Sequence, residues 1–208
     1  MEQGRLWEFR VCRASQGCRK SQFKSPEEIK QFDDCLEASG LDRQVHSGPV
    51  LIHHKFRAAA AGCPNCCSEP QIRDFAIVAG TRPRVSDEAC SDCGACVKVC
   101  PDRAITLEQG PVIDREQCLE CGLCIRACPT GTLVPALQGV KVLVGGRLGR
   151  RPTLARPLTD LVPLAEGLRI LDACIAYYLS ERNPNERFSS LILRLGLDHL
   201  RQAIQETE

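Results

Sequence analysis

Two cysteine pairs decide the interpretation of this chain: Cys12-Arg-Ala-Ser-Gln-Gly-Cys18 and Gly62-Cys63-Pro-Asn-Cys66-Cys67. The glycine and proline of the second stretch favour a rigid turn, so Cys63 and Cys67 can converge on one metal site. Cys66 adjoins Cys67, and neighbouring side chains diverge, so we expect Cys66 beside the site and not among its ligands. The first pair lies among arginines and lysines, and a plain solvated basic loop is the alternative for that stretch.

Eight further cysteines form a repeated run, which is the pattern of a bacterial two-cluster ferredoxin. In that pattern three closely spaced cysteines bind one [4Fe–4S] cluster, and the fourth cysteine of each run binds the other cluster. Short strands are expected at 105–107 and 112–113. Zinc is the competing interpretation, and the doubled run followed by proline disfavours it. The predicted ligand sets are Cys90, Cys93, Cys96 and Cys128 for one cluster, and Cys118, Cys121, Cys124 and Cys100 for the other.

The composition restricts the class of protein. The chain has 208 residues, a net charge of +1 and 25% charged residues, so it carries no charge excess suited to nucleic acid. It has 15 cysteines but no apolar signal-peptide core, and tight Cys-x-x-Cys runs suit metal clusters better than disulfides. No stretch approaches 18 apolar residues. We therefore expect a soluble, cytoplasmic protein without a membrane span.

Several elements can be predicted around the cysteines. Ser25-Pro26-Glu27-Glu28 has the residues of a helix start with a capping box, and Gly40 suits the end of that helix. Residues 73–79 and 140–144 are predicted strands. Residues 163–181 and 186–206 have apolar residues at helical spacing and are predicted to form two helices. Cys35 and Cys174 lie on apolar stripes and are expected in the core.

Two basic stretches are candidate anion sites. Residues 49–61 are predicted to begin as a strand, with His53, Lys55 and Arg57 on one face. Such cations, close to a cysteine pair, suit a small oxyanion or an acidic cofactor, although a solvated strand face explains them equally well. The second stretch is a glycine-rich loop suited to a cofactor with several carboxylates, with a plain basic loop as the alternative. Its arginines are Arg147, Arg150, Arg151 and Arg156.

Taken together, these motifs resemble the sirohaem-binding half of the nitrite/sulfite reductase family. The family pattern is Cys-x5-Cys followed by Cys-x3-Cys, as at Cys12/Cys18 and Cys63/Cys67. The resemblance covers most of residues 10–206, and the ferredoxin-like insert resembles that of anaerobic and dissimilatory-type sulfite reductases. Further matching stretches are Gly62-Cys63-Pro64-Asn65, Gln71-Ile72-x-Asp74, Val144-Gly145-Gly146-Arg147-Leu148-Gly149-Arg150 and Glu186-Arg187-Phe188.

The resemblance implies an α+β fold in which a mixed sheet with helices, at 1–83 and 134–208, is interrupted by a ferredoxin-like domain at 84–133. It also implies a third [4Fe–4S] cluster on Cys12, Cys18, Cys63 and Cys67, with Cys67 bridging to the sirohaem iron. Lys55 and Arg57 match the family's basic strand, and Arg10 is a looser match for a further substrate cation. Arg147, Arg150 and Arg151 would bind sirohaem carboxylates.

The implied reaction is the six-electron reduction of sulfite to sulfide or of nitrite to ammonia. An electron-donor protein would supply electrons through the ferredoxin-like clusters. The alternative function is an electron-transfer protein built on a degenerate reductase scaffold. Family enzymes carry a further half-domain before the first cysteine pair, whereas 11 residues precede Cys12 here. A partner subunit, a second copy of the chain or a longer protein is therefore expected to complete the haem pocket.

Overall fold

The computed structural model describes residues 5–43 and 50–206. Its main sheet has the order β1-β2-β3-β6-β7. Strands β1, β2 and β3 are parallel, and β6 runs antiparallel to both β3 and β7, so the sheet is mixed as expected. The bounds are β1 Trp7–Val11, β2 Phe56–Ala61, β3 Phe75–Val85, β6 Leu133–Val144 and β7 Arg156–Pro157.

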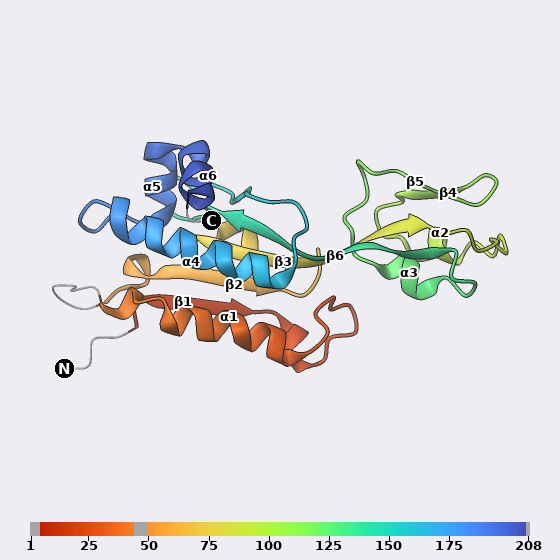
Figure 1. Ribbon diagram of the computed structural model, residues 1–208, viewed down its shortest axis with the longest axis horizontal. Coiled ribbons are helices and arrows are strands. Elements are labelled where there is room, and N and C mark those ends of the chain that lie inside the picture. The colour runs from red at the N-terminus through yellow and green to blue at the C-terminus, as the bar shows by residue number, and fades with distance from the viewer. Residues whose placement is uncertain (1–4, 44–49, 207–208) are drawn as a thin grey trace.

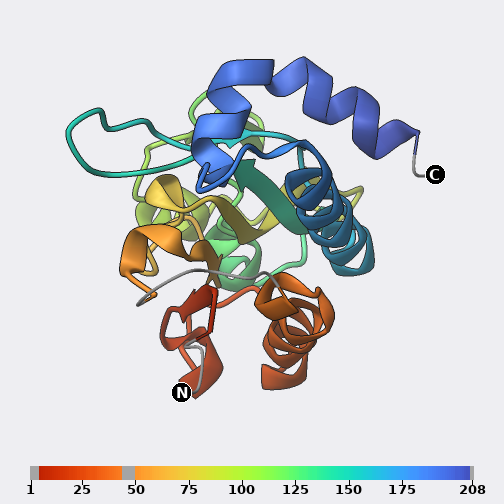
Figure 2. The same cartoon turned by 90° about the vertical axis from the view of Figure 1, so that its left-hand side faces the viewer.

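Two helices, α1 (Pro26–Ala38) and α4 (Leu164–Glu181), lie side by side on one face of this sheet (Figure 2). Alternate residues of β2 reach that face, where Phe56 and Ala58 enter the core with Phe32 of α1. On the opposite side lie the loops that follow β1 and β2. The sheet therefore separates a helix-covered apolar face from a loop-covered polar face.

Helix α1 begins where the sequence predicts, but the predicted capping box does not form. The Ser25 side chain makes no capping hydrogen bond to the helix backbone. The Glu28 carboxylate instead accepts a hydrogen bond from the backbone N–H of Lys24, at 2.7 Å. Gly40 then adopts a left-handed conformation with φ of +78° just beyond the helix, which agrees with its predicted role as a stop signal.

Residues 86–132 form a smaller unit, which we call the small lobe. It holds α2 (Ala95–Val99), β4 (Ile105–Leu107), β5 (Pro111–Ile113) and α3 (Leu123–Ala127). Strands β3 and β6 extend from the main sheet into it, and it lies away from helices α1 and α4–α6 (Figure 1). The ferredoxin-like domain and its boundaries at 84 and 133 stay a prediction.

The internal repeat of the small lobe is visible in its backbone. Gly94 and Gly122 have φ values of +70° and +68° at the starts of α2 and α3. The residue two positions earlier is also left-handed in each run, with φ of +49° at Asp92 and +60° at Glu120. The two cysteine runs thus share one local conformation.

Two predicted elements differ from the structure. Residue 49 of the strand predicted at 49–61 lies outside the described residues, and η3 (Ile52–His54) is a 3-10 turn before β2 begins at Phe56. His53 therefore does not share a strand face with Arg57. The helix predicted at 186–206 is two helices, α5 (Phe188–Leu195) and α6 (Leu197–Gln205). Gly196, with φ of +90°, separates them because its backbone leaves the helical region.

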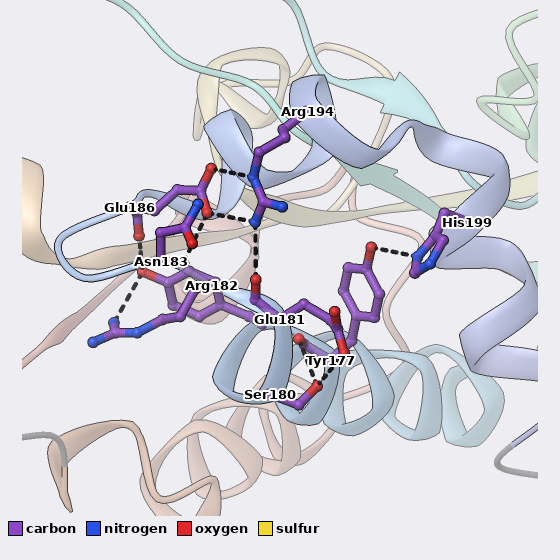
Figure 3. A network of polar contacts seen from close by, with 9 residues as sticks. Tyr177, Ser180, Glu181, Arg182, Asn183, Glu186, Arg194 and His199 are labelled. Atoms are coloured by element: carbon purple, nitrogen blue, oxygen red, sulfur yellow. Dashed lines mark hydrogen bonds and ion pairs between the residues drawn. The ribbon is translucent and has the colours of Figure 1, made fainter.

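A polar network fixes the turn between α4 and α5 (Figure 3). Arg194 pairs with the Glu186 carboxylate at 2.8 Å and donates to the backbone carbonyl of Glu181 at 2.9 Å. Glu186 also accepts from the backbone N–H of Asn183 at 2.9 Å. On α6, a ring nitrogen of His199 lies 2.8 Å from the hydroxyl of Tyr177 in α4. These contacts involve no cysteine and position the C-terminal helices.

Three short 3-10 turns complete the elements, namely η1 (Arg13–Gln16), η2 (Leu41–Arg43) and η4 (Pro70–Ile72). In the described part of the chain, no helix is long and apolar enough to cross a membrane.

Candidate functional site

The first site is formed where β1 and β2 end. Because these strands are parallel, Cys12 after β1 and Cys63 after β2 reach the same edge of the sheet. The backbone N–H of Gly62 donates to the sulfur of Cys12 at 3.2 Å. All four predicted ligands, Cys12, Cys18, Cys63 and Cys67, line one cavity of about 100 Å³. We call these four residues the outer quartet.

The thiols of the outer quartet lie close enough to influence one another. Burial raises the pKa of the Cys63 thiol, and the thiols of Cys12, Cys18 and Cys67 raise it further. Cys66 does not line the cavity, in agreement with the expectation that it lies beside the site. Its backbone is left-handed, with φ of +53°, and this turn directs the chain from Cys63 to Cys67. An iron–sulfur cluster bound by these four residues would stabilise their thiolate forms, which otherwise repel one another.

The eight lobe cysteines separate into two groups of four, and each group contains the fourth cysteine of the other run. Cys100 lines a cavity with the second run, and Cys128 lines a cavity with the first. We call Cys100, Cys118, Cys121 and Cys124 the near quartet, and Cys90, Cys93, Cys96 and Cys128 the far quartet. The structure brings together the same four side chains that the ferredoxin spacing predicts for each cluster.

Backbone N–H groups donate hydrogen bonds to two of the lobe sulfurs. The backbone N–H groups of Ala104 and Asp92 each lie 3.4 Å from a lobe sulfur, that of Cys100 and that of Cys90 respectively. Such bonds to cluster sulfurs adjust reduction potentials.

Cys124, in helix α3, and Cys128, the last cysteine of the lobe, differ in environment. Burial raises the pKa of the Cys124 thiol to about 11. Burial also acts to raise the pKa of Cys128, but hydrogen bonds from the backbone of residues 130, 132 and 133 and from the Thr130 hydroxyl lower it to about 7. In the described residues, no three His, Cys, Asp or Glu side chains are arranged to hold a single metal ion.

The two remaining cysteines have structural surroundings. Cys174 is fully buried in the main core, as expected. Cys35 is partly buried against that core, and its thiol lies 2.9 Å from a carboxylate oxygen of Asp172. Burial and that carboxylate raise the pKa of Cys35 to about 12. Neither residue lines a cysteine cavity.

Two of the three predicted substrate cations are paired with carboxylates on the polar face of the sheet. The guanidinium of Arg57 lies 3.5 Å from the Glu8 carboxylate, and that of Arg10 lies 2.6 Å from Glu69. Lys55 immediately precedes β2, is partly buried and makes no ion pair with a described residue. Within residues 5–43 and 50–206, therefore, Lys55 has no carboxylate partner, whereas Arg57 and Arg10 are held in ion pairs.

Arg73 joins these pairs into one array, and sequence reasoning missed it. Its side chain is 1% exposed and contacts both Glu8, at 3.3 Å, and Glu69, at 3.2 Å. Burial lowers the pKa of Arg73, and the adjacent positive charge of Arg57 lowers it further. One feature of the sequence could have indicated this array. Glu8 and Arg10 alternate with the apolar residues of β1, and this alternation places their charges on the sheet face opposite the core. The array holds three cations and two anions.

The arginines of the predicted cofactor loop have different surroundings. Arg147 donates to the Ser190 hydroxyl of α5 at 2.8 Å and to the backbone carbonyl of Arg151 at 3.1 Å. Paired backbone hydrogen bonds between Arg147 and Thr153 close the loop. Arg150 and Arg151 are exposed on it. The structure thus assigns Arg147 a contact that holds the loop and leaves two arginines accessible.

The glycines of this loop allow it to approach the chain's own backbone. The N–H of Gly146 donates to the carbonyl of Arg73 at 2.8 Å, and that of Gly145 donates to Asp74 at the same distance. A Cβ atom on Gly146 would lie 2.5 Å from the carbonyl oxygen of Gln71 and 2.8 Å from Arg73 backbone atoms. The cofactor loop is therefore packed directly against the segment that follows the outer quartet.

This close approach predicts the effect of Gly146→Ala. The added methyl group meets backbone atoms that cannot rotate away, so we expect the free energy of unfolding to fall by about 1–3 kcal/mol. Urea denaturation under anaerobic conditions measures it. Leu148→Ala is the control, because Leu148 is exposed on the same loop. A Gly146→Ala protein as stable as Leu148→Ala would contradict this packing.

Asp74 connects the polar face to the C-terminal helices. Its carboxylate is 1% exposed and accepts from the backbone N–H of Arg57 at 3.0 Å and of Ser189 at 3.2 Å. The guanidinium of Arg187 lies 3.8 Å away. Burial raises the pKa of Asp74, whereas Arg187 and the two N–H donors act to lower it. One buried carboxylate therefore holds β2, β3 and α5 in register around the array.

Comparison with known proteins identifies the family of the chain. A family model described as the nitrite and sulphite reductase 4Fe-4S domain matches residues 14–208. The chain belongs to this family. Nitrite and sulphite reductase 4Fe-4S domains bind an iron–sulfur cluster and belong to oxidoreductases, so the coarse predictions of a [4Fe–4S] protein and of an oxidoreductase family are confirmed.

Two of the relatives are named as a sulfite reductase or a subunit of one. The chain is 35% identical over 157 residues to the coenzyme F420-dependent sulfite reductase of Methanocaldococcus jannaschii, covering 74% of this chain and 25% of that protein. It is 32% identical over 69 residues to a subunit of the anaerobic sulfite reductase of Salmonella typhimurium, covering 33% of this chain and 20% of that protein. The chain thus spans about a quarter or less of these two relatives.

Solved structures show the same fold at low identity. Dissimilatory sulfite reductase I matches 95% of this chain and 51% of its own, with a TM-score of 0.65 and 17% identity. The NirA protein of Mycobacterium tuberculosis matches 93% of this chain and 26% of its own, with a TM-score of 0.53 and 19% identity. The predicted α+β fold with a mixed sheet and helices is confirmed.

Proposed function

We propose that the chain is the cluster-binding part of a sirohaem-dependent sulfite or nitrite reductase. The observation that carries the proposal is the convergence of Cys12, Cys18, Cys63 and Cys67 on one cavity at the carboxyl ends of two parallel strands. Four thiols on one cavity are the donor set of a [4Fe–4S] cluster. In this proposal the outer quartet would bind the catalytic cluster, and Cys67 would also help to hold the sirohaem iron.

The small lobe would hold two further clusters that supply electrons. Their ligands would be the near and far quartets, each with one cysteine from the opposite run. Reduction of sulfite to hydrosulfide consumes six electrons and seven protons and releases three waters. A single cluster carries one electron at a time, so a series of clusters suits this reaction. The immediate source would be an electron-donor protein.

Guanidinium N–H groups that make no hydrogen bond support sirohaem binding by this chain. Buried N–H atoms of Arg57, Arg73 and Arg187 donate no hydrogen bond to a described residue, although carboxylates lie 3.5 Å from Arg57 and 3.8 Å from Arg187. Guanidinium groups bind carboxylates well, and sirohaem carries several carboxylates. When bound, sirohaem would supply the iron at which sulfite or nitrite is reduced. Arg147, Arg150 and Arg151 would bind its carboxylates, and Lys55 would attract the oxyanion, with Arg57 and Arg10 as further cations.

The ion pairs on the polar face favour a second candidate function. A substrate oxyanion would require the positive charges of Arg57 and Arg10. Glu8 and Glu69 neutralise much of these charges. A protein that only transfers electrons needs no free cation at this position. In that case the three clusters would conduct electrons to a partner enzyme, and the chain would bind no sirohaem.

Anaerobic iron and sirohaem quantification separates these functions. Three clusters and one sirohaem predict about 13 iron atoms per chain, and three clusters alone predict about 12. We expect the higher value, a sirohaem absorption spectrum, and reoxidation of the reduced protein by sulfite or nitrite. Full cluster content without sirohaem, and without reoxidation by either anion, would leave electron transfer as the function.

The haem pocket would be completed by another polypeptide. The Salmonella typhimurium relative is one subunit of an assembly by its name, and both sulfite reductase relatives are several times longer than the matched region. A partner subunit, a second copy of this chain or a further segment of the same protein would cover the polar face. The iron and sirohaem determination is therefore made on the assembly that contains this polypeptide, and a higher sirohaem content in the assembly than in the chain alone is the expected result.

A further inference from the structure

The near and far quartets have matching backbones but different surroundings. Glu120 precedes Cys121 of the near quartet, and its side chain is 8% exposed. Asp92 precedes Cys93 of the far quartet at the equivalent position of the repeat. Asp92 is exposed, and its carboxylate has no ion pair or hydrogen bond with any residue in the described ranges. The difference arises because cations of the main sheet contact the carboxylate of the second run.

Two cations of the main sheet hold Glu120. Arg82 of β3 pairs with its carboxylate, and the ammonium of Lys141 on β6 lies 2.8 Å from the other oxygen. Arg82 also contacts the Asp160 carboxylate at 2.6 Å. These hydrogen bonds to Asp160 and Glu120 raise the pKa of Arg82, so it stays charged. We call Arg82, Glu120, Lys141 and Asp160 the Glu120 ion-pair cluster.

The backbone beside this cluster also joins the lobe to the sheet. The N–H of Thr81 donates to the carbonyl of Glu120 at 2.7 Å, and Thr81 forms an isolated parallel bridge with Cys121. A Cβ atom on Gly80 would lie 3.2 Å from the same carbonyl oxygen. A small residue is therefore favoured where the near quartet approaches β3.

The loop that carries Cys18 contacts the near run as well. Arg126 of α3 donates to the backbone carbonyl of Arg19 at 2.7 Å. The Gln22 side chain accepts from the Thr81 hydroxyl at 2.8 Å and lies against Gly122, where a Cβ atom would be 2.7 Å from its oxygen. The outer quartet and the near quartet are thus linked through residues adjacent to their own cysteines.

A crevice of about 370 Å³ separates the two quartets at this junction. Cys63 of the outer quartet lines one side, and Cys121 of the near quartet lines the other. No cysteine of the far quartet is among the described residues that line it. Cys93 of the far quartet is instead exposed to solvent. The three quartets consequently lie in the order outer, near, far.

We propose that the Glu120 ion-pair cluster positions the near quartet against the outer quartet, so that electrons enter at the far quartet and pass through the near quartet. This inference rests on the proposed function. Each transfer moves one electron: a reduced flavin or iron–sulfur carrier loses it at the far quartet, and the cluster of the outer quartet gains it. Glu120 is a positioning residue and touches no substrate.

The test compares Glu120→Gln with Asp92→Asn. Each substitution keeps side-chain size and removes one negative charge beside one lobe cluster, so direct charge effects are matched. The readout is the magnetic interaction between clusters in the EPR spectrum of dithionite-reduced, anaerobically purified protein. The signal of the outer quartet is identified by its loss in Cys12→Ser. In the unaltered protein, the magnetic interaction with the cluster of the near quartet is expected to broaden this signal. We expect Glu120→Gln to lose this broadening and Asp92→Asn to keep it.

Two results would overturn the inference. One is an outer-quartet signal whose broadening is unchanged in Glu120→Gln, and the other is equal loss in both variants. Lys141→Gln removes one cation of the same cluster from a partly exposed position and gives a second measurement, with the same expected loss, if Glu120→Gln does not fold. Failure of the proposed function has a different signature, because the unaltered protein would then contain no sirohaem and would not be reoxidised by sulfite or nitrite, or would contain fewer than three clusters by iron content.

Discussion

Replacement of Cys67 by serine is expected to remove about four iron atoms per chain, which is the content of one [4Fe–4S] cluster. Cys67 lines the cavity of the outer quartet together with Cys12, Cys18 and Cys63. Serine is a poor ligand for iron in such a cluster, so the outer cluster should be lost while both lobe clusters remain. Sirohaem retention and sulfite or nitrite reduction should be lost with it, since the proposed bridge to the haem iron is this sulfur.

The adjacent residue provides the matched control. Cys66 is next to Cys67 in sequence but does not line the cavity. Cys66→Ser is therefore expected to keep the full iron content and the EPR signal of the outer cluster. Iron and acid-labile sulfide determinations on both anaerobically purified variants give the comparison. Equal iron loss in the two variants, or iron loss in Cys66→Ser alone, would show that the ligand set is wrongly assigned.

Replacement of Asp74 by alanine is expected to lower the free energy of unfolding by about 3–5 kcal/mol, the range for breaking a buried charge pair. The buried carboxylate accepts from the backbone N–H groups of Arg57 and Ser189. Its removal leaves both donors and the Arg187 guanidinium without this partner. Because β2, β3 and α5 all meet at this carboxylate, the loss should affect the fold as a whole.

Asp198→Ala is the control for this substitution. The Asp198 side chain is 92% exposed and pairs with Arg201 one helical turn away. Its removal should change the free energy of unfolding by less than about 1 kcal/mol, because exposed ion pairs contribute little. Urea denaturation followed by circular dichroism, with clusters intact, measures both. Similar effects from the two substitutions would contradict the central position assigned to Asp74.

Cysteine spacing predicted more of the candidate site than any other feature of the sequence. Tight spacing determines which thiols can meet, so the exchange of Cys100 and Cys128 between the two runs was predictable. The ion pairs on the polar face were not, because Glu8 and Glu69 approach Arg57 and Arg10 only after β1, β2 and η4 have come together. A charge pattern in one segment does not specify its partner in another.

The fold was predictable to a similar extent. Proline at the first position of α1 and the apolar stripe of α4 were sufficient to predict those helices. The division of 186–206 into two helices was missed because the apolar residues continue at helical spacing across Gly196. The 3-10 turn at Ile52–His54 was missed because alternation of apolar and basic residues also suits a strand.

The point at which the small lobe joins the sheet bears on how such a chain arises. Val85 at the end of β3 and Leu133 at the start of β6 are register partners, so the chain leaves the sheet and returns to it at adjacent positions. An ordinary hairpin turn is the simplest connection between two such strands. A gene segment encoding the lobe can therefore enter at the tip of a hairpin in one event without altering the pairing of any other strand. An insertion at this position would leave the strand pairing of the main sheet unchanged.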